Sequence, residues 1–126
     1  TIVVNSSQRS SILSARHNMA ATFRAPFELA GAEVLSGEGY PGWKMNPNSK
    51  LLVVAVDQYK KLYGKDPFVG GIHAGLECGL FSEKFPGMDM VSLGPTMRGV
   101  HSPDERMLIP SVQLVWDHLL AILANI

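Results

Sequence analysis

Residues 68–93 constrain the fold most, because they have the pattern of a strand, a helix and a second strand joined by short links. Residues 68–72 and 88–93 are short and mostly apolar, as buried strands are, although Gly70 and Gly71 weaken the first of them. Residues 76–84 between them have helical character. Such a unit predicts two parallel strands connected by a right-handed crossover. We therefore expect an α/β fold, with the loops that follow both strands at one edge of the sheet.

The first 42 residues predict a similar strand–helix–strand order. Residues 1–5, which are rich in β-forming side chains, and residues 32–35 are the strand candidates. Four apolar residues between them recur at helical spacing and predict one buried face: Ile12, Ala15, Met19 and Phe23. Pro26 should kink or end this helix because it has no N–H to donate. If the helix continues past it, Gly31 is the expected C-terminal stop.

Two further helices are expected in the rest of the chain. Residues 46–49 look like a helix start and Gly64 like its end, with a buried face formed by Leu51, Leu52, Ala55, Tyr59 and Leu62. Residues 107–109 are expected to form a short strand, and Pro110 is expected to begin the last helix. The expected buried side of that helix comprises Val112, Val115, Trp116, Leu119, Leu120, Leu123 and Ile126.

Composition narrows the possible partners and compartments. The 126 residues include 11 basic and 11 acidic side chains, so no basic surplus is available for nucleic acid or an acidic membrane. No apolar run approaches the roughly 20 residues of a membrane span, and no signal peptide is visible. Cys78 is the only cysteine, which excludes an internal disulfide and a multi-thiolate zinc site and favours a reducing cytoplasm.

The candidate for chemistry lies in residues 94–106, a stretch rich in turn formers that should be a loop at a strand end. Within it, Ser102, Pro103 and Glu105 have the pattern of a capped helical turn, with Glu105 closing a capping box. Such a turn would hold the preceding residue, His101, on rigid backbone. An imidazole fixed in this way suits a metal ligand or an acid–base group. On local chemistry alone, an ordinary loop histidine is the better interpretation.

Three motifs change the interpretation of His101, because together they resemble a known family. Residues 71–81 (GIHAGLECGLF), residues 92–95 with 99–105 (SLGP and GVHSPDE), and residues 39–44 with 46–49 (GYPGWK and NPNS) occur in one order and spacing. They resemble the C-terminal part of aminoacyl-histidine dipeptidases, also called Xaa-His dipeptidases or peptidase D. These enzymes are carnosinase-like di-zinc metallopeptidases, and the resemblance runs over essentially the whole chain.

The resemblance implies a metal role for His101, because the histidine of this motif is a terminal zinc ligand in that family. A di-zinc site polarises the substrate carbonyl and activates water, and it needs several His and carboxylate ligands. The family's other ligands and its general-base glutamate precede the part seen here, so this chain is expected to contain no catalytic residue. Asp104 and Glu105 follow the histidine and are not the family's Glu-Glu pair. The chain is thus expected to be a fragment that is inactive alone.

Three further residues are implied to bind substrate. Arg9 matches the lid arginine that pairs with the substrate's C-terminal carboxylate, for which a guanidinium fork is well suited. Gly75 would allow close backbone approach to that carboxylate at a helix start. His73 could line the pocket, although a histidine that holds the loop together is an equally good interpretation. Without the family, Arg9 would be taken as a solvated loop residue.

Taken together, these features predict that the chain is a C-terminal fragment of a zinc-dependent dipeptidase that hydrolyses Xaa-His dipeptides such as carnosine. Residues 1–42 would be the strand–helix–strand half of a lid domain, and residues 43–126 the C-terminal βαβ-type half of the catalytic domain. The complete enzyme is expected to be a cytoplasmic homodimer with two zinc ions. Two alternatives remain open: a non-catalytic α/β oligomerisation domain, and a related amidohydrolase or aminopeptidase with another substrate.

Overall fold

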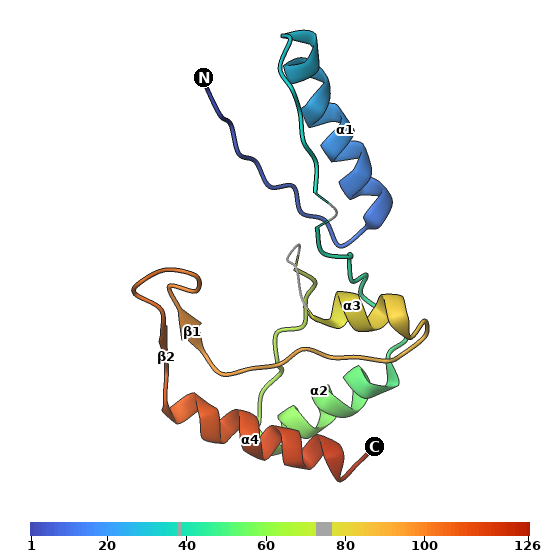
Figure 1. Cartoon of the computed structure of the whole chain (residues 1–126). Coiled ribbons are helices and arrows are strands. Elements are labelled where there is room, and N and C mark those ends of the chain that lie inside the picture. The colour runs from blue at the N-terminus through green and yellow to red at the C-terminus, as the bar shows by residue number, and fades with distance from the viewer. Residues whose placement is uncertain (38, 73–76) are drawn as a thin grey trace. The chain divides into compact units, whose positions relative to one another are not determined.

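The computed structural model describes residues 1–37, 39–72 and 77–126, and its regular structure is mostly helical (Figure 1). The elements in chain order are α1 (Leu13–Leu29), α2 (Lys50–Tyr63), α3 (Glu77–Lys84), β1 (Met97–Arg98), β2 (Arg106–Met107) and α4 (Pro110–Leu123). They form two compact units, each made of two stretches: Thr1–Asn46 with Gly70–Met88, and Pro47–Val69 with Asp89–Ile126. None of the helices in the described ranges has the length and hydropathy required to cross a bilayer.

Helix α1 of the first unit continues through Pro26. Of the two expected outcomes at this proline, the helix therefore follows the one in which it continues toward Gly31. It ends at Leu29, and Gly31 follows with a φ of 82°, which confirms Gly31 as the stop. The expected buried face was wrong for this unit. No residue of α1 is buried, and Met19 and Phe23 are both exposed. Helical spacing shows which side chains share a face, but only a packing partner buries that face.

Helix α2 of the second unit has the ends that the sequence predicted. The Ser49 hydroxyl accepts a hydrogen bond from the N–H of Leu52 at 2.9 Å, and it thereby satisfies one of the free donors of the first turn. Gly64 closes the helix in the left-handed conformation, with a φ of 66°. Lys60 in the last turn also forms an ion pair with Asp66 beyond the helix end. Both ends of α2 are therefore set locally.

Helices α2 and α4 pack against each other through a polar and aromatic contact (Figure 1). The Nε2 atom of His118 lies 2.7 Å from the carbonyl oxygen of Ala55, and Tyr63 donates its hydroxyl to the Leu114 carbonyl at 2.5 Å. The ring of Tyr59 stands edge-on to His118, with centroids 5.3 Å apart. Because each hydrogen bond joins one helix to the backbone of the other, these contacts fix the position of α4 along α2.

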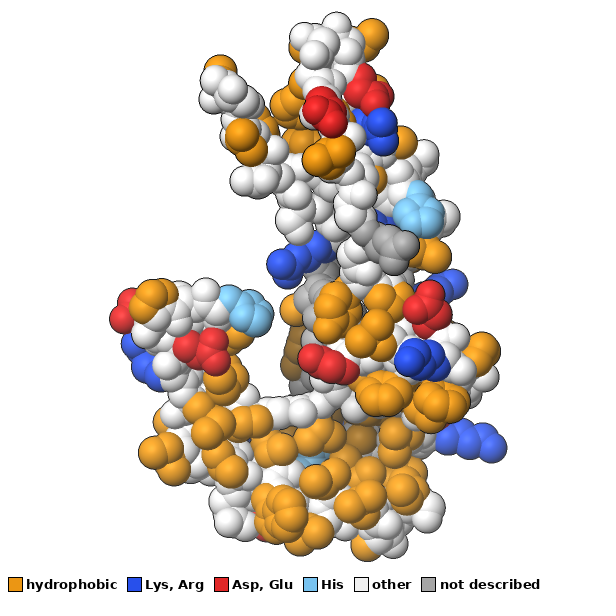
Figure 2. Space-filling model, viewed as in Figure 1, with side chains coloured by type: hydrophobic (Ala, Val, Ile, Leu, Met, Phe, Trp, Pro, Cys, Tyr) orange, Lys and Arg blue, Asp and Glu red, His pale blue; other side chains and the backbone are white. Residues whose placement is uncertain are grey.

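The face of α4 that is buried differs from the expected one. Ser111, His118 and Ile122 are buried, while Val115 and Leu119 of the expected stripe are half-buried. The other expected residues stay exposed, among them Trp116 at 54%. Figure 2 shows hydrophobic side chains gathered at the surface over α4. The helix therefore has one face on α2 and a second, apolar face that the described residues leave uncovered.

The hairpin of β1 and β2 is antiparallel, and Met97 lies opposite Met107 in its register. Its base is attached to α4 by Ser111, whose hydroxyl donates to the Leu108 carbonyl at 2.6 Å and accepts from the N–H of Thr96 at 2.9 Å. Leu108 also donates its N–H to the Thr96 carbonyl at 2.9 Å. The start of α4 thus holds the base of the hairpin, whose loop contains His101.

The expected parallel strands are not formed in the part of the chain that the structure describes. β1 and β2 are the strands seen there, and of the expected strand at residues 107–109 only Met107 lies in β2. The other expected strands have no ladder partner: residues 1–5, 32–35, 68–72 and 88–93. A strand exists only where a neighbour completes its backbone hydrogen bonds, and β propensity alone supplies no neighbour. The expected crossover is therefore absent from the described residues.

Asp89 makes a long-range contact with the start of α2, and this contact predicts a pH dependence. Its Oδ2 atom accepts from the N–H of Leu51 at 3.0 Å. This backbone hydrogen bond, followed by one with the Ser49 side chain, lowers the pKa of Asp89 below its ordinary value of 3.8. The carboxylate therefore stabilises the fold above that ordinary pKa, and the contribution is lost as the pH falls through the lower pKa of the folded state.

We expect Asp89→Asn to lower the free energy of unfolding at neutral pH, and the difference from wild type to shrink once the pH falls below the folded-state pKa of Asp89. Urea unfolding of both proteins over a series of pH values measures this. Asp104→Asn is the matched control, because Asp104 lies in an exposed loop and its carboxylate accepts no hydrogen bond among the described residues. A constant Asp89→Asn difference at all pH values would contradict the assignment.

Candidate functional site

His101 lies in the loop that joins β1 to β2, with its side chain exposed. Its φ of 65° is left-handed, and it is the one non-glycine residue of the described ranges with a positive φ. That conformation brings Cβ close to the following carbonyl and needs local support. The support comes from Glu105, whose Oε2 atom accepts a hydrogen bond from the His101 N–H at 2.7 Å. The backbone that carries the imidazole is therefore held in an uncommon conformation.

The rest of the loop is fixed by a second set of hydrogen bonds centred on Ser102. Its N–H donates to the Gly99 carbonyl at 3.1 Å, its hydroxyl donates to the same carbonyl at 2.7 Å, and the N–H of Asp104 lies 3.3 Å from the hydroxyl oxygen. Gly99 has a φ of 61°, and a Cβ there would lie 3.0 Å from the Asp104 carbonyl oxygen. The loop thus needs glycine where the sequence has it.

The expected capped turn is formed as a single turn, in which the Glu105 N–H donates to the Ser102 carbonyl at 3.1 Å, but the expected capping box was wrong. Ser102 acts as a local cap for Asp104, but no helix follows, and the chain turns directly into β2. The Glu105 carboxylate binds the N–H of His101, whereas a capping box requires it to bind the N–H of Ser102. The Ser102 N–H is already used by the Gly99 carbonyl, which explains the change of partner.

No metal centre is visible among the residues that the structure describes. They contain no group of three or more His, Cys, Asp or Glu side chains arranged to share an ion. A stable zinc site in a protein takes three or four such ligands. The exposed imidazole of His101 is chemically suited to be one of them, since the loop fixes its backbone. Within the described ranges, His101 is therefore a candidate ligand without a cluster of further ligands around it.

The expected substrate-binding residues are described only in part. Arg9 is exposed in the first unit, and no hydrogen bond or ion pair engages its guanidinium among the described residues. His101 belongs to the second unit. His73 and Gly75 lie outside the described residues. Arg9 and His101 are therefore each described within their own unit.

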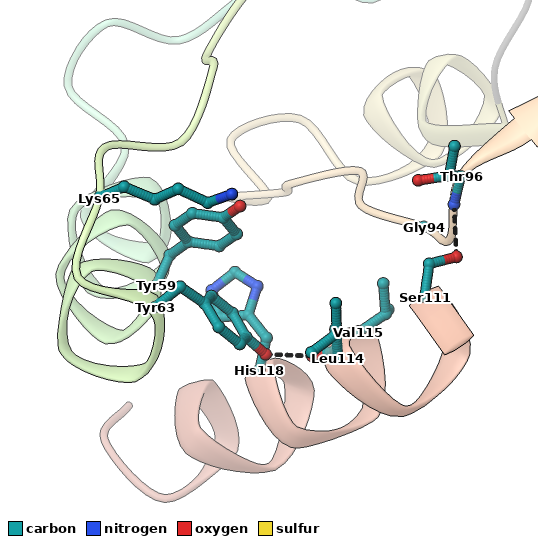
Figure 3. A pocket seen from close by; sticks show the side chains of 9 residues that line it. All are labelled: Tyr59, Tyr63, Lys65, Gly94, Thr96, Ser111, Leu114, Val115 and His118. Atoms are coloured by element: carbon teal, nitrogen blue, oxygen red, sulfur yellow. Dashed lines mark hydrogen bonds between the residues drawn. The ribbon is translucent and has the colours of Figure 1, made fainter. Parts of the chain in front are cut away.

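A pocket of about 390 Å³ lies within the second unit, between α2 and α4 (Figure 3). Nine residues line it: Tyr59, Tyr63, Lys65, Gly94, Thr96, Ser111, Leu114, Val115 and His118. Figure 3 shows the Lys65 ammonium and the Tyr59 hydroxyl at one end, and Thr96 with Ser111 at the other. The pocket is therefore walled by rings and apolar side chains and carries donors at both ends.

The polar groups of this pocket mainly stabilise the packing of α2 against α4. A carbonyl oxygen can only accept, so His118 donates its Nε2–H to Ala55. Partial burial, and next the nearby Asp117 carboxylate, raise the pKa of the Tyr63 phenol above its ordinary value. The phenol therefore stays protonated as a donor to Leu114. These groups join the two helices, and no nucleophile is paired with a base here.

Sequence reasoning missed the contacts of Glu105 and His118 for different reasons. The Ser102–Glu105 spacing did signal an ordered turn, but the identity of the donor depends on the conformation of the loop. His118 lies in the stretch expected to form the last helix, but it is not among the residues expected on the buried side of that helix. Its position at helical spacing from Ser111 and Ile122 was a usable signal, because the three residues share the face that packs on α2.

Comparison with known proteins identifies relatives. No family profile matches the chain. The cytosol non-specific dipeptidase of Escherichia coli K12 is 46% identical over 99 residues, which are 79% of this chain and 20% of that protein. The crystal structure of aminoacylhistidine dipeptidase from Vibrio alginolyticus matches 93% of this chain and 24% of its own, with 46% identity and a TM-score of 0.73.

The chain thus spans about a fifth to a quarter of the length of these relatives. Identity of this level, together with a matching backbone over nearly all of the chain, establishes common descent, and the mostly helical structure with its two-stranded sheet matches part of the Vibrio enzyme. We conclude that the chain is homologous to a segment of the cytosol non-specific and aminoacylhistidine dipeptidases.

Proposed function

We propose that this chain is part of a zinc-dependent dipeptidase that hydrolyses Xaa-His dipeptides such as carnosine. The observation that carries the proposal is the match to aminoacylhistidine dipeptidase over 93% of the chain. The exposed His101 on its fixed hairpin loop supports it further. The metal ligands that the described residues do not supply would come from other parts of the complete enzyme. On this proposal the chain alone is inactive.

Each sequence-predicted residue has a role in this proposal. His101 supplies one imidazole ligand to a zinc site, and zinc in such a site polarises the substrate carbonyl. Arg9, whose guanidinium has no partner among the described residues, pairs with the C-terminal carboxylate of the dipeptide. Gly75 lets the backbone approach the same carboxylate, and His73 lines the substrate-binding pocket of the complete enzyme. Arg9→Lys tests the carboxylate contact, because a single ammonium cannot form a bidentate pair.

The unpaired apolar segments support a place within a larger sheet. On our proposal, residues 1–42 form half of a lid domain and residues 43–126 the C-terminal half of a catalytic domain. The segments at 1–5, 32–35, 68–72 and 88–93 would pair with strands outside this chain, which makes the complete fold α/β. The exposed apolar face of α4 would be covered in the same way, because apolar surface is stabilised by removal from water.

The first test is a zinc titration of the 126-residue chain by calorimetry, in chelator-stripped buffer at neutral pH. We expect weak or no binding, because one exposed imidazole cannot replace a complete ligand set. The His101→Ala chain is the matched control and should give the same titration. Tight binding of one or more zinc ions per chain would contradict the proposal, since the chain or its oligomer would then build its own site.

A chimaera tests the activity and the substrate class. In it, this chain replaces the homologous segment of the Escherichia coli dipeptidase, which supplies the remaining residues. We expect the chimaera to hydrolyse carnosine and other dipeptides but not N-acyl amino acids. Preferential turnover of N-acyl amino acids would instead support a related amidohydrolase. A folded, zinc-loaded chimaera without any turnover would count against the proposal.

A second candidate function is self-association, and the uncovered apolar face of α4 favours it. In this alternative the chain is a non-catalytic oligomerisation domain. Sedimentation equilibrium separates the two candidates. A stable dimer of the isolated chain that Trp116→Glu dissociates would support self-association, whereas a monomer would support a segment that packs on the rest of a peptidase.

For the complete enzyme we propose a cytoplasmic homodimer.

A further inference from the structure

Glu105 holds the backbone at His101, and this contact extends the proposed function. We propose that Glu105 is a positioning residue that fixes the backbone from which the His101 imidazole reaches the metal. The inference rests on the proposed role of His101. It concerns a residue that the sequence assigned only to a helix cap, and whose partner in the structure is a different N–H group.

The first step of the argument is the backbone conformation. A histidine with a φ of 65° is held away from its ordinary conformations, and the loop would relax if nothing stabilised it. The hydrogen bond from the His101 N–H to Glu105 Oε2 is 2.7 Å long and involves a charged acceptor, which makes it one of the stronger contacts of the loop. Glu105 is therefore the side chain that stabilises this conformation.

The second step concerns the direction of the Cα–Cβ bond that carries the ring. The backbone on both sides of His101 is fixed, by Gly99 and Ser102 before and after it and by β2 beyond Glu105. With φ set by the Glu105 contact, the Cα–Cβ bond of His101 has one direction relative to the hairpin. A metal ligand that is fixed in advance binds more tightly, because less freedom is lost on binding.

The third step separates positioning from ligation. Glu105 is itself a carboxylate and could in principle bind a metal ion. Its Oε2 atom is engaged by the His101 N–H, and the described residues contain no cluster in which it joins two other ligands. The two roles differ chemically, because a glutamine side chain accepts the same backbone hydrogen bond through its amide oxygen but is a poor zinc ligand.

The experiment compares Glu105→Gln, Glu105→Ala and the control Asp104→Ala. Asp104 lies in the same loop, and its carboxylate accepts no hydrogen bond among the described residues. In the isolated chain, amide hydrogen exchange and backbone chemical shifts of His101 report the contact. We expect slow exchange and left-handed shifts in wild type, Glu105→Gln and Asp104→Ala, and loss of both in Glu105→Ala. Circular dichroism of the helices verifies that each variant is folded.

In the chimaera, zinc affinity is measured by chelator competition, together with kcat and KM. Glu105→Ala should weaken zinc binding about 10- to 100-fold, which is the range for residues that orient a metal ligand. Glu105→Gln and Asp104→Ala should stay close to wild type. Unchanged zinc affinity in Glu105→Ala would overturn the proposal. Equal losses in Glu105→Gln and Glu105→Ala, with the His101 amide still protected in Glu105→Gln, would overturn it in favour of ligation or charge.

Failure of the proposed function has a different signature. If His101→Ala leaves zinc affinity and turnover of the chimaera unchanged, His101 is no ligand and the proposed function fails at this residue. The positioning proposal fails alone when His101→Ala abolishes zinc binding at its site but Glu105→Ala does not. The two results are therefore distinguishable in one set of variants.

Discussion

Replacing His101 by alanine in the dipeptidase chimaera should lower kcat/KM by at least about 100-fold. Loss of a residue that merely orients a ligand costs about 10- to 100-fold, and loss of the ligand itself should cost more. The zinc content of the purified protein should fall in parallel. Turnover of carnosine and metal analysis after dialysis against a weak chelator measure both effects.

His17→Ala is the matched control for that experiment. His17 is also an exposed histidine, but it lies in helix α1 of the first unit and no motif assigns it a role. We expect its kcat/KM and zinc content to equal those of the unmodified chimaera. Near-normal turnover of the His101→Ala protein would rule out the ligand role.

The second large effect is expected for stability, when His118 is replaced by alanine. His118 is 9% exposed, its Nε2 atom contacts the Ala55 carbonyl, and its ring stands edge-on to Tyr59 and Tyr63. Removing the ring deletes a buried hydrogen bond and leaves a cavity between α2 and α4. We expect the free energy of unfolding to fall by about 2–3 kcal/mol, measured by urea unfolding followed by circular dichroism.

Two comparisons make the His118 result specific. His118→Gln keeps a side-chain N–H donor but not the ring, so its stability should fall between wild type and His118→Ala. His17→Ala removes an exposed helical histidine and should change stability by no more than about 0.5 kcal/mol. A His118→Ala protein as stable as the His17→Ala protein would show that the contact between α2 and α4 does not depend on this ring.

The ends of the helices were predictable because their signals are local. Ser49 and Gly64 bound α2 as expected, Pro110 opens α4, and Gly31 follows the end of α1. Each of these residues acts through its own φ or through a hydrogen bond to a neighbour three or four positions away. Such interactions need no tertiary partner, and the sequence alone therefore specifies them.

The buried faces were less predictable, because burial depends on what the rest of the chain presents. In α4 an apolar stripe that includes Trp116 remains exposed, while Ser111 and His118 are buried against α2 and the hairpin. A hydrophobic pattern identifies the face of a helix that can be buried, but it does not identify the segment that packs on this face. The same holds for the expected strands, which need a neighbour outside their own sequence.

The candidate site was likewise predictable only in its local features. The cap-forming sequence beside His101 indicated an ordered loop, but only the family resemblance singled out this histidine as a candidate ligand. The sequence by itself determined that residues 94–106 form a loop and that Ser102 and Glu105 order it. Only the tertiary structure decided that Glu105 binds the His101 N–H and that Ser111 holds the base of the hairpin. The physical reason is that these hydrogen bonds depend on where the folded backbone places each donor, which spacing along the chain does not fix.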